Sequence, residues 1–314
     1  MHPSPQSSDL LRALWTLDVL GKKPEYFTPP QAMRDRVESL EKLPPLPEIA
    51  RRFLELKSDP YCDAAKLAQI VELDPALAAQ VIRWANSALF GYRRRILTVK
   101  DAIVLALGFE QVFYLAFSLC SLKPLQAPTE GLLGKRFFWR QTLAGSALMQ
   151  KLVLLLDAGE RPDLAAVHLV YLLHNTGHLL LAHLFRNEFD YLVRVAGANT
   201  GSPLISIERF TLGVDHGQLG AWLMQAWSMP EYLQTVIHHH HNPFYRGDHE
   251  RIVWLTCLTD HLLGRIGIGD ACHLSLADTP LYRNLKIDPA TAEECLQRIV
   301  DAREELDRAV ACLI

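Results

Sequence analysis

The spacing of apolar residues constrains this chain more than any other feature. They recur at i, i+3 and i+4 in most windows, whereas period-two runs rich in Val, Ile and Thr are missing. A helix gathers such residues on one face, and a half-buried strand would need alternation instead. The spacing therefore predicts an all-α protein, and 314 residues that are 49% hydrophobic suffice for one large domain or two ordinary ones.

Capping residues indicate where several helices begin. Asp63 and Thr98 can accept from the first free N–H groups of a helix. Asp74-Pro75 and Asp288-Pro289 each join such a residue to a proline, which suits the first helical position, and Pro47 suits a first turn for the same reason. The predicted helices cover 48–57, two short helices between Asp63 and Gly91, a helical unit from Thr98 broken at Gly108, and about 136–156, 163–184, 188–198, 204–212, 215–227, 230–240, 251–267 and 288–314.

Charge and patterning argue against a nucleic-acid partner. The net charge is −3 and the pI is near 6.5, so there is no global basic field, and the cluster 93–95 of three arginines is interpreted as a solvated loop. A helix-turn-helix at 98–122 would need polar and basic side chains on its second helix. The residues offered there are Val112, Phe113, Leu115, Ala116, Phe117 and Leu119, which predict core packing.

Cysteine usage and the apolar runs predict a cytoplasmic protein. The six cysteines are scattered without a C-x-x-C pair, as is typical of reduced thiols, and the N-terminus has no signal-peptide pattern. Residues 164–185 carry no Lys, Arg, Asp or Glu, but they include four histidines and an asparagine, which a bilayer centre would penalise. We therefore expect a buried helix there and no membrane span.

Histidine is concentrated in one region of the chain. Twelve of the thirteen histidines lie between His168 and His273. His174 and His178 are four residues apart, a spacing that lets two imidazoles on one helix face share a metal such as zinc. Taken singly, a histidine in an apolar helix is more often a hydrogen-bonded core residue, and this interpretation is preferred for His178, His183 and His261.

Longer motifs resemble the HDOD family, a bacterial signalling domain descended from metal-dependent HD phosphohydrolases. The motifs in the first half are "LPPLPEIA", "IVELDPALAAQVIRWANSALFG" and "ILTVKDAIVLALG". The second half adds "FWRQTLAGSALM", "LLHNTGHLLLA", "HGQLGAWLMQAWSMPEYLQTVIHHHHNP" and "LTDHL". The Pro- and Gly-rich segment 123–135 divides the resemblance into an N-terminal helical half, 36–122, and an HD-like helical bundle, 136–265, with extensions at 1–35 and 266–314.

The resemblance also assigns ligand positions. Gln141 stands where HD enzymes have their first metal-binding histidine, and His174-Asn175 stands for their His-Asp pair. His178 falls where the cyclic-dinucleotide phosphodiesterases have a lysine. The candidate metal ligands that remain are His174, His216, His240, His241 and Asp260.

The two replaced ligands favour a protein without catalysis. A carboxylate can bridge two cations, but an amide offers one neutral oxygen and an NH₂ group that repels the second ion. We therefore expect no catalytic residue and no organic cofactor, with at most a single Fe, Mn or Zn ion. The alternative is a residual HD-type phosphodiesterase acting on a cyclic dinucleotide or nucleotide with one metal.

The resemblance implies a regulatory module that binds unidentified signalling proteins, or a small ligand in its cleft, and that can form homo-oligomers. The N-terminal segment carries apolar residues at helical spacing: Leu10, Leu11, Leu14, Trp15, Leu17 and Leu20. They predict a helix that either docks on a partner or packs on its own domain.

Overall fold

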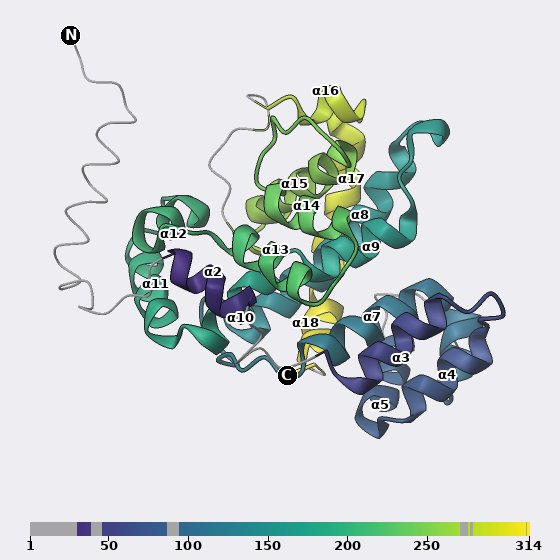
Figure 1. Ribbon diagram of the computed structural model, residues 1–314. Helices are drawn as coiled ribbons and strands as arrows, with labels where there is room; N and C mark the ends of the chain where they lie inside the picture. Colours follow the sequence, from purple (N-terminus) through teal and green to yellow (C-terminus); the bar gives the residue numbers. More distant parts are fainter. Residues whose placement is uncertain (1–29, 39–45, 87–93, 271–275, 277–278, 312) are drawn as a thin grey trace, which may run out of the picture.

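The computed structural model is an assembly of helices, which confirms the all-α prediction (Figure 1). It describes residues 30–38, 46–86, 94–270, 276, 279–311 and 313–314. Within those ranges there is no strand. The predicted N-terminal docking helix and the arginine at 93 lie outside the described residues.

The N-terminal half is a group of short helices capped as the sequence predicts. Its elements are α3 (Glu48–Lys57), α4 (Ala64–Glu72), α5 (Pro75–Ala85), α6 (Val99–Asp101), η2 (Ala102–Leu107, a π-helix) and α7 (Phe109–Leu122). Asp63 accepts from the Lys66 N–H, and Asp74 accepts from the N–H groups that follow Pro75. Pro47 is the N-cap of α3 and not a first-turn residue, because the helix begins at Glu48.

Helix α7 joins this half to the rest of the protein. Every residue from Val112 to Leu122 is buried, and the helix packs against α3, α5 and α9. Its side chains therefore belong to the core, as predicted, and are not exposed to the groove of a DNA duplex.

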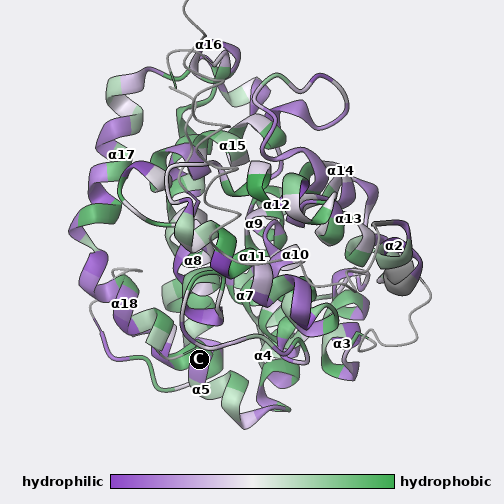
Figure 2. Cartoon of the chain, turned by 90° about the vertical axis from the view of Figure 1, so that its left-hand side faces the viewer, coloured by the Kyte–Doolittle hydropathy of each residue, from purple (hydrophilic) through white to green (hydrophobic). Residues whose placement is uncertain are grey.

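The C-terminal half is a larger bundle. Its helices are α8 (Lys135–Leu155), α9 (Leu164–Leu173), α10 (Thr176–Leu184), α11 (Arg186–Ala198), α12 (Leu204–Leu212), α13 (His216–Ala226), α14 (Glu231–His239) and α15 (Glu250–Arg265). Helix α2 (Pro30–Glu38) precedes the N-terminal half in sequence but packs on α13 of this bundle, where Met33 is buried. Apolar residues of both halves are buried in one core. Figure 2 shows hydrophobic and hydrophilic residues following one another along the helices.

Two predicted helices are broken in the structure. The helix expected at 163–184 is α9 and α10, separated at His174 and Asn175. The final helix is α17 (Pro289–Asp301) and α18 (Arg303–Ala311), which both pack on α8, and α16 (Leu281–Leu285) precedes them unpredicted. No helix in the described ranges is long and apolar enough to cross a membrane.

Candidate metal centre

A break in the backbone places the first two site residues. Because α9 ends at Leu173 and α10 begins at Thr176, His174 and Asn175 lie in the turn between them, and both are buried. Gly177, two residues after Asn175, packs against His216 of α13. A Cβ at this position would lie 1.9 Å from the backbone oxygen of His216, so only glycine permits this approach of the two helices.

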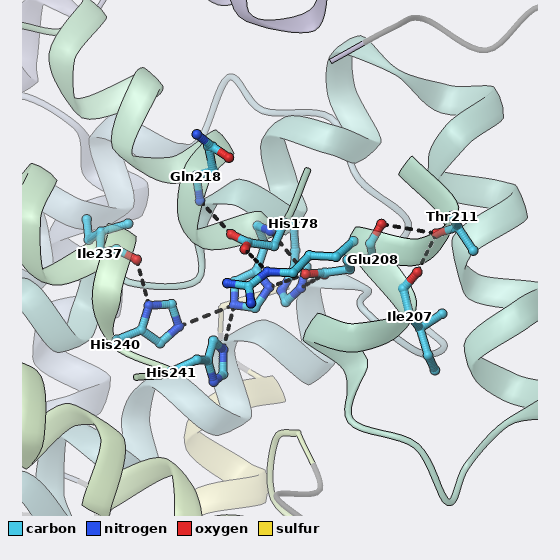
Figure 3. Close-up of polar contacts among 11 residues, drawn as sticks. His178, Ile207, Glu208, Thr211, Gln218, Ile237, His240 and His241 are labelled. Carbon is cyan, nitrogen blue, oxygen red and sulfur yellow. Dashed lines mark hydrogen bonds and ion pairs between the residues drawn. The ribbon is translucent and has the colours of Figure 1, made fainter. Parts of the chain in front are cut away.

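His216 is fixed at the first position of α13 by its neighbour. The Asp215 side chain is the N-cap of α13, accepting from the Gln218 N–H at 2.8 Å and from Arg209 Nε at 2.7 Å. The His216 imidazole is fully buried and contacts Glu208 of α12. Figure 3 shows Glu208 among the histidines of this site.

Glu208 connects two histidines. One carboxylate oxygen accepts from His216 Nδ1 at 2.7 Å and from the His216 backbone N–H at 3.1 Å, and the other lies 2.8 Å from His178 Nε2. Burial opposes protonation of His178, but the hydrogen bond and charge of Glu208 outweigh it and raise the His178 pKa. Burial lowers the pKa of His216 well below its ordinary value, so this imidazole is neutral at pH 7.

The end of α14 brings two further imidazoles to His216. His240 donates from Nδ1 to the carbonyl of Ile237 at 2.6 Å, and its Nε2 lies 3.2 Å from His216 Nε2. His241 Nε2 lies 2.9 Å from the same nitrogen (Figure 3). Burial lowers the pKa of His240 to about 4 and that of His241 well below 6.5, so neither imidazole is charged at neutral pH.

These contacts fix the tautomers. A carbonyl or carboxylate oxygen can only accept a hydrogen bond, so the ring nitrogen facing it must carry a proton. Nδ1 of His174 faces the Tyr171 carbonyl, Nδ1 of His216 faces the Glu208 carboxylate, and Nδ1 of His240 faces the Ile237 carbonyl. Nδ1 is therefore protonated in all three rings. Because the rings of His216 and His240 are neutral, Nε2 of each carries a lone pair and no proton. The lone pairs of His216 and His240 face each other at 3.2 Å, which is unfavourable unless a positive charge lies between them.

Asp260 of α15 lies in the second cluster, beside His174 and His240. Its Oδ1 accepts from the Tyr171 hydroxyl at 2.7 Å and from Gln141 Nε2 at 3.1 Å, and it lies 3.4 Å from His174 Nε2. The tyrosine reaches this position because Gly145 leaves room, since a Cβ there would lie 2.1 Å from the ring. Two protein donors thus occupy the carboxylate oxygen nearest Gln141.

The five predicted ligands do come together, in two clusters that share His240. In each cluster the ligand atoms lie within 4.8 Å of one another: His216, His240 and His241 form one, and His174, His240 and Asp260 form the other. His174 and His178 lie in different clusters, because the backbone break separates them. His178 is the buried, hydrogen-bonded residue that the sequence analysis preferred, and its partner is Glu208.

Sequence reasoning missed Glu208 and Tyr171. Glu208 is one carboxylate among 35 acidic residues, and its position eight residues before His216 carries no recognisable metal-ligand spacing. Tyr171 lies in an apolar helix and would be taken for core. Both residues act by fixing the ligands, since hydrogen bonds from the second shell orient imidazoles and carboxylates.

The three-histidine cluster fits a zinc-type cation. Tetrahedral zinc holds imidazole nitrogens at about 2.0–2.1 Å, which places those nitrogens roughly 3.3 Å apart. The two Nε2 separations here are 3.2 and 2.9 Å. A cation bound there would replace the repulsion between lone pairs by three coordinate bonds, while Glu208 and the Ile237 carbonyl hold two of the rings.

Comparison with known proteins places this fold in a family. The HDOD domain matches residues 43–243. A candidate signal transduction protein from Marinobacter aquaeolei VT8 is 28% identical, with a TM-score of 0.75 over 98% of this chain and 66% of that chain. An HDOD domain protein of unknown function from Geobacter sulfurreducens is 22% identical, with a TM-score of 0.70 over 90% of this chain and 97% of that one.

A curated protein, uncharacterised, from Treponema pallidum (strain Nichols) is 24% identical over 212 residues. The match covers 67% of this chain but 39% of that protein, so the chain spans well under half of its relative. The all-α architecture, the buried histidine and aspartate clusters, and the match over most of the bundle agree. The chain belongs to the HDOD family.

Proposed function

We propose that this protein is a cytoplasmic regulatory module of bacterial signal transduction that binds partner proteins and does not hydrolyse phosphoesters. The observation that carries the proposal is Asn175, buried at the position of the bridging carboxylate of HD enzymes. Its Oδ1 has no hydrogen-bond partner among the described residues, and a neutral amide oxygen cannot hold two cations together.

Asp260 supports the same conclusion. In a two-metal centre both oxygens of its carboxylate would be available to cations, but here Tyr171 and Gln141 donate to Oδ1. Hydrolysis by the two-metal route needs both ions to hold the attacking and leaving oxygens of an in-line displacement. Without a bridging carboxylate at position 175, the site is suited to one structural cation, Fe, Mn or Zn, bound by His216, His240 and His241.

An exposed apolar segment supports protein binding. Val104 and Leu105 are consecutive in the π-helix η2 and are 59% and 51% exposed, and Leu97 just before this unit is 67% exposed. Large apolar side chains grouped on a surface are typical of protein interaction sites. We therefore assign the partner-binding face to the N-terminal half.

The test has a catalytic and a binding arm. Tag-free protein, loaded in turn with Fe²⁺, Mn²⁺ and Zn²⁺, is expected to show no turnover of bis(para-nitrophenyl) phosphate, and Asn175→Asp is the matched gain-of-charge control. Partners captured from the native host by the unaltered chain should be lost with Leu105→Glu and kept with Leu154→Glu, an equally exposed leucine on α8. Turnover that disappears in His174→Ala would overturn the proposal.

A second function has one observation in its favour. Three neutral imidazoles are also the protein ligands of some hydrolytic zinc sites. A single-metal phosphodiesterase acting on a cyclic dinucleotide is therefore the alternative. Near-stoichiometric metal together with turnover in the catalytic arm would establish it.

A further inference from the structure

A hollow lies between the N-terminal half and the C-terminal extension, far along the chain from the histidine clusters. Its walls come from α5, from residues 95–97 and from α18, and its volume is about 630 Å³. Pockets that hold small molecules typically have volumes of about 300–1,000 Å³. The HDOD domain matches residues 43–243, so α18 lies outside the match and the hollow is not a feature of the shared domain alone.

Two hydrogen bonds fix the wall formed by residues 95–97. The Asn86 side chain, at the end of α5, donates to the Ile96 carbonyl and accepts from the Ile96 N–H, both at 2.8 Å. The Ile96 side chain is buried in the core, whereas Arg95 and Leu97 on either side of it are exposed. The segment therefore presents a guanidinium group and an apolar side chain at the edge of the hollow.

Helix α18 forms another wall and is held by its packing on α8, where Asp307 pairs with Arg140 at 3.1 Å. Glu305 and Arg308 of this helix line the hollow, and their charged atoms lie 3.3 Å apart. Glu304, which does not line the hollow, lies 3.9 Å from Arg308. The Arg308 side chain is 67% exposed, and ion pairs this exposed contribute little, so an anion in the hollow can compete for its guanidinium group.

The charged side chains that line the hollow are mainly cationic. Three arginines face one glutamate, which leaves a formal charge of +2: Arg83, Arg95 and Arg308 against Glu305. Arg95 makes no hydrogen bond or ion pair with any residue that the structure describes. A guanidinium group binds phosphate through two parallel hydrogen bonds, so the lining favours a phosphorylated ligand.

The rest of the lining is apolar, with one unused donor. Ile82, Ile96 and Leu97 line the hollow, and Leu97 is 67% exposed. Trp84 lines it as well, and its buried Nε1 has no hydrogen-bond partner within the described ranges. An indole N–H can only donate, so the missing partner is an acceptor. The lining therefore suits a molecule that joins acceptor oxygens to a flat or apolar body.

We propose that this hollow binds a nucleoside monophosphate. A phosphate monoester carries a charge of about −1.5 to −2 at pH 7, which matches the formal charge of the lining. Arg95 and Arg308 hold the phosphate in this proposal, and the base lies against Ile82 and Leu97. A free phosphate ion would leave the apolar wall without a partner, and a sugar phosphate would place hydroxyl groups against it. The nucleotide would link α18 to the N-terminal half.

The experiment measures the binding of AMP, GMP, CMP and UMP to the full, tag-free chain by isothermal titration calorimetry. At least one should bind, and Arg95→Gln and Arg308→Gln should each weaken its binding by about tenfold or more. The matched controls Arg94→Gln and Arg303→Gln replace exposed arginines that do not line the hollow, and they should stay within about twofold of the unaltered protein. Inorganic phosphate and the corresponding nucleoside should each bind at least about tenfold more weakly than the nucleotide.

Three outcomes would overturn the proposal: no binding of any of the four nucleotides, equal weakening in the lining and control variants, or inorganic phosphate that binds as tightly as the nucleotide. A hexaglutamate peptide that binds where the nucleotides do not would assign the hollow to an acidic segment of a partner, and would also overturn it.

Unfolding curves identify any variant that fails to fold. In that case hydrogen exchange of the unaltered chain decides, because the nucleotide should slow exchange at 95–97 and 305–309 and leave exchange at 174–178 unchanged. Partner capture and phosphoester turnover are measured separately, so this inference can fail while the proposed function stands.

Discussion

The contact between α10 and α13 depends on a single missing methyl group, and Gly177→Ala tests it. The new Cβ would lie 1.9 Å from the backbone oxygen of His216, whereas ordinary contact begins near 3.4 Å, so the helices would have to separate by about 1.5 Å. Backbone atoms of two helices cannot yield as a flexible side chain can. A gap of this size forfeits more than about half of the dispersion energy between the atoms that it separates.

We expect the variant to lose about 3 kcal/mol or more of unfolding free energy. In a thermal melt this corresponds to a decrease of about 5 °C or more. Gly197→Ala is the control, since it also replaces a helical glycine but its Cβ meets no heavy atom within 4 Å in the described structure. It should be neutral or stabilising by up to about 1 kcal/mol.

Urea denaturation followed by circular dichroism measures both variants. The separation should also widen the contact between the rings of His178 and His216, whose centroids lie 4.0 Å apart. The reasoning is refuted if the two variants unfold within about 1 kcal/mol of each other.

Three further predictions concern residues outside the candidate metal centre. Burial lowers the pKa of His168 to about 4 from an ordinary value of 6.5, so the unfolded chain takes up the proton first. The neutral, buried His168 therefore contributes about 3 kcal/mol to the unfolding free energy above pH 6.5, and this contribution is lost as the pH falls toward 4. His168→Gln should make the unfolding free energy depend less on pH between these two values. The Asn86 side chain donates to the Ile96 carbonyl and accepts from the Ile96 N–H, both at 2.8 Å. Asn86→Ala should therefore lower the unfolding free energy by about 2 kcal/mol. An unchanged midpoint of urea unfolding would contradict this prediction. Burial raises the pKa of Cys120 to about 12, so alkylation at pH 8 followed by peptide mass analysis should modify the exposed Cys62 and spare Cys120; labelling of both at similar rates would contradict the burial.

Local signals were enough to predict much of the fold. Asp63, Asp74 and Thr98 cap helices where the sequence placed them, because capping joins groups two or three residues apart. The burial of α7 also followed from its composition. The break at His174 was not predicted, because the apolar residues on both sides of 174–178 continue the helical spacing and no proline marks the end of a helix there.

The sequence by itself predicted which ligands are replaced, because its resemblance to the HD pattern places Gln141 and Asn175 at ligand positions and an amide cannot replace a bridging carboxylate. Only the tertiary structure decided what surrounds the remaining ligands. Gln141 reaches Asp260 across 119 residues of sequence, and Tyr171 reaches it across 89. Such pairings depend on how helices pack, and helix packing is set by the whole core, so no spacing within one segment encodes it.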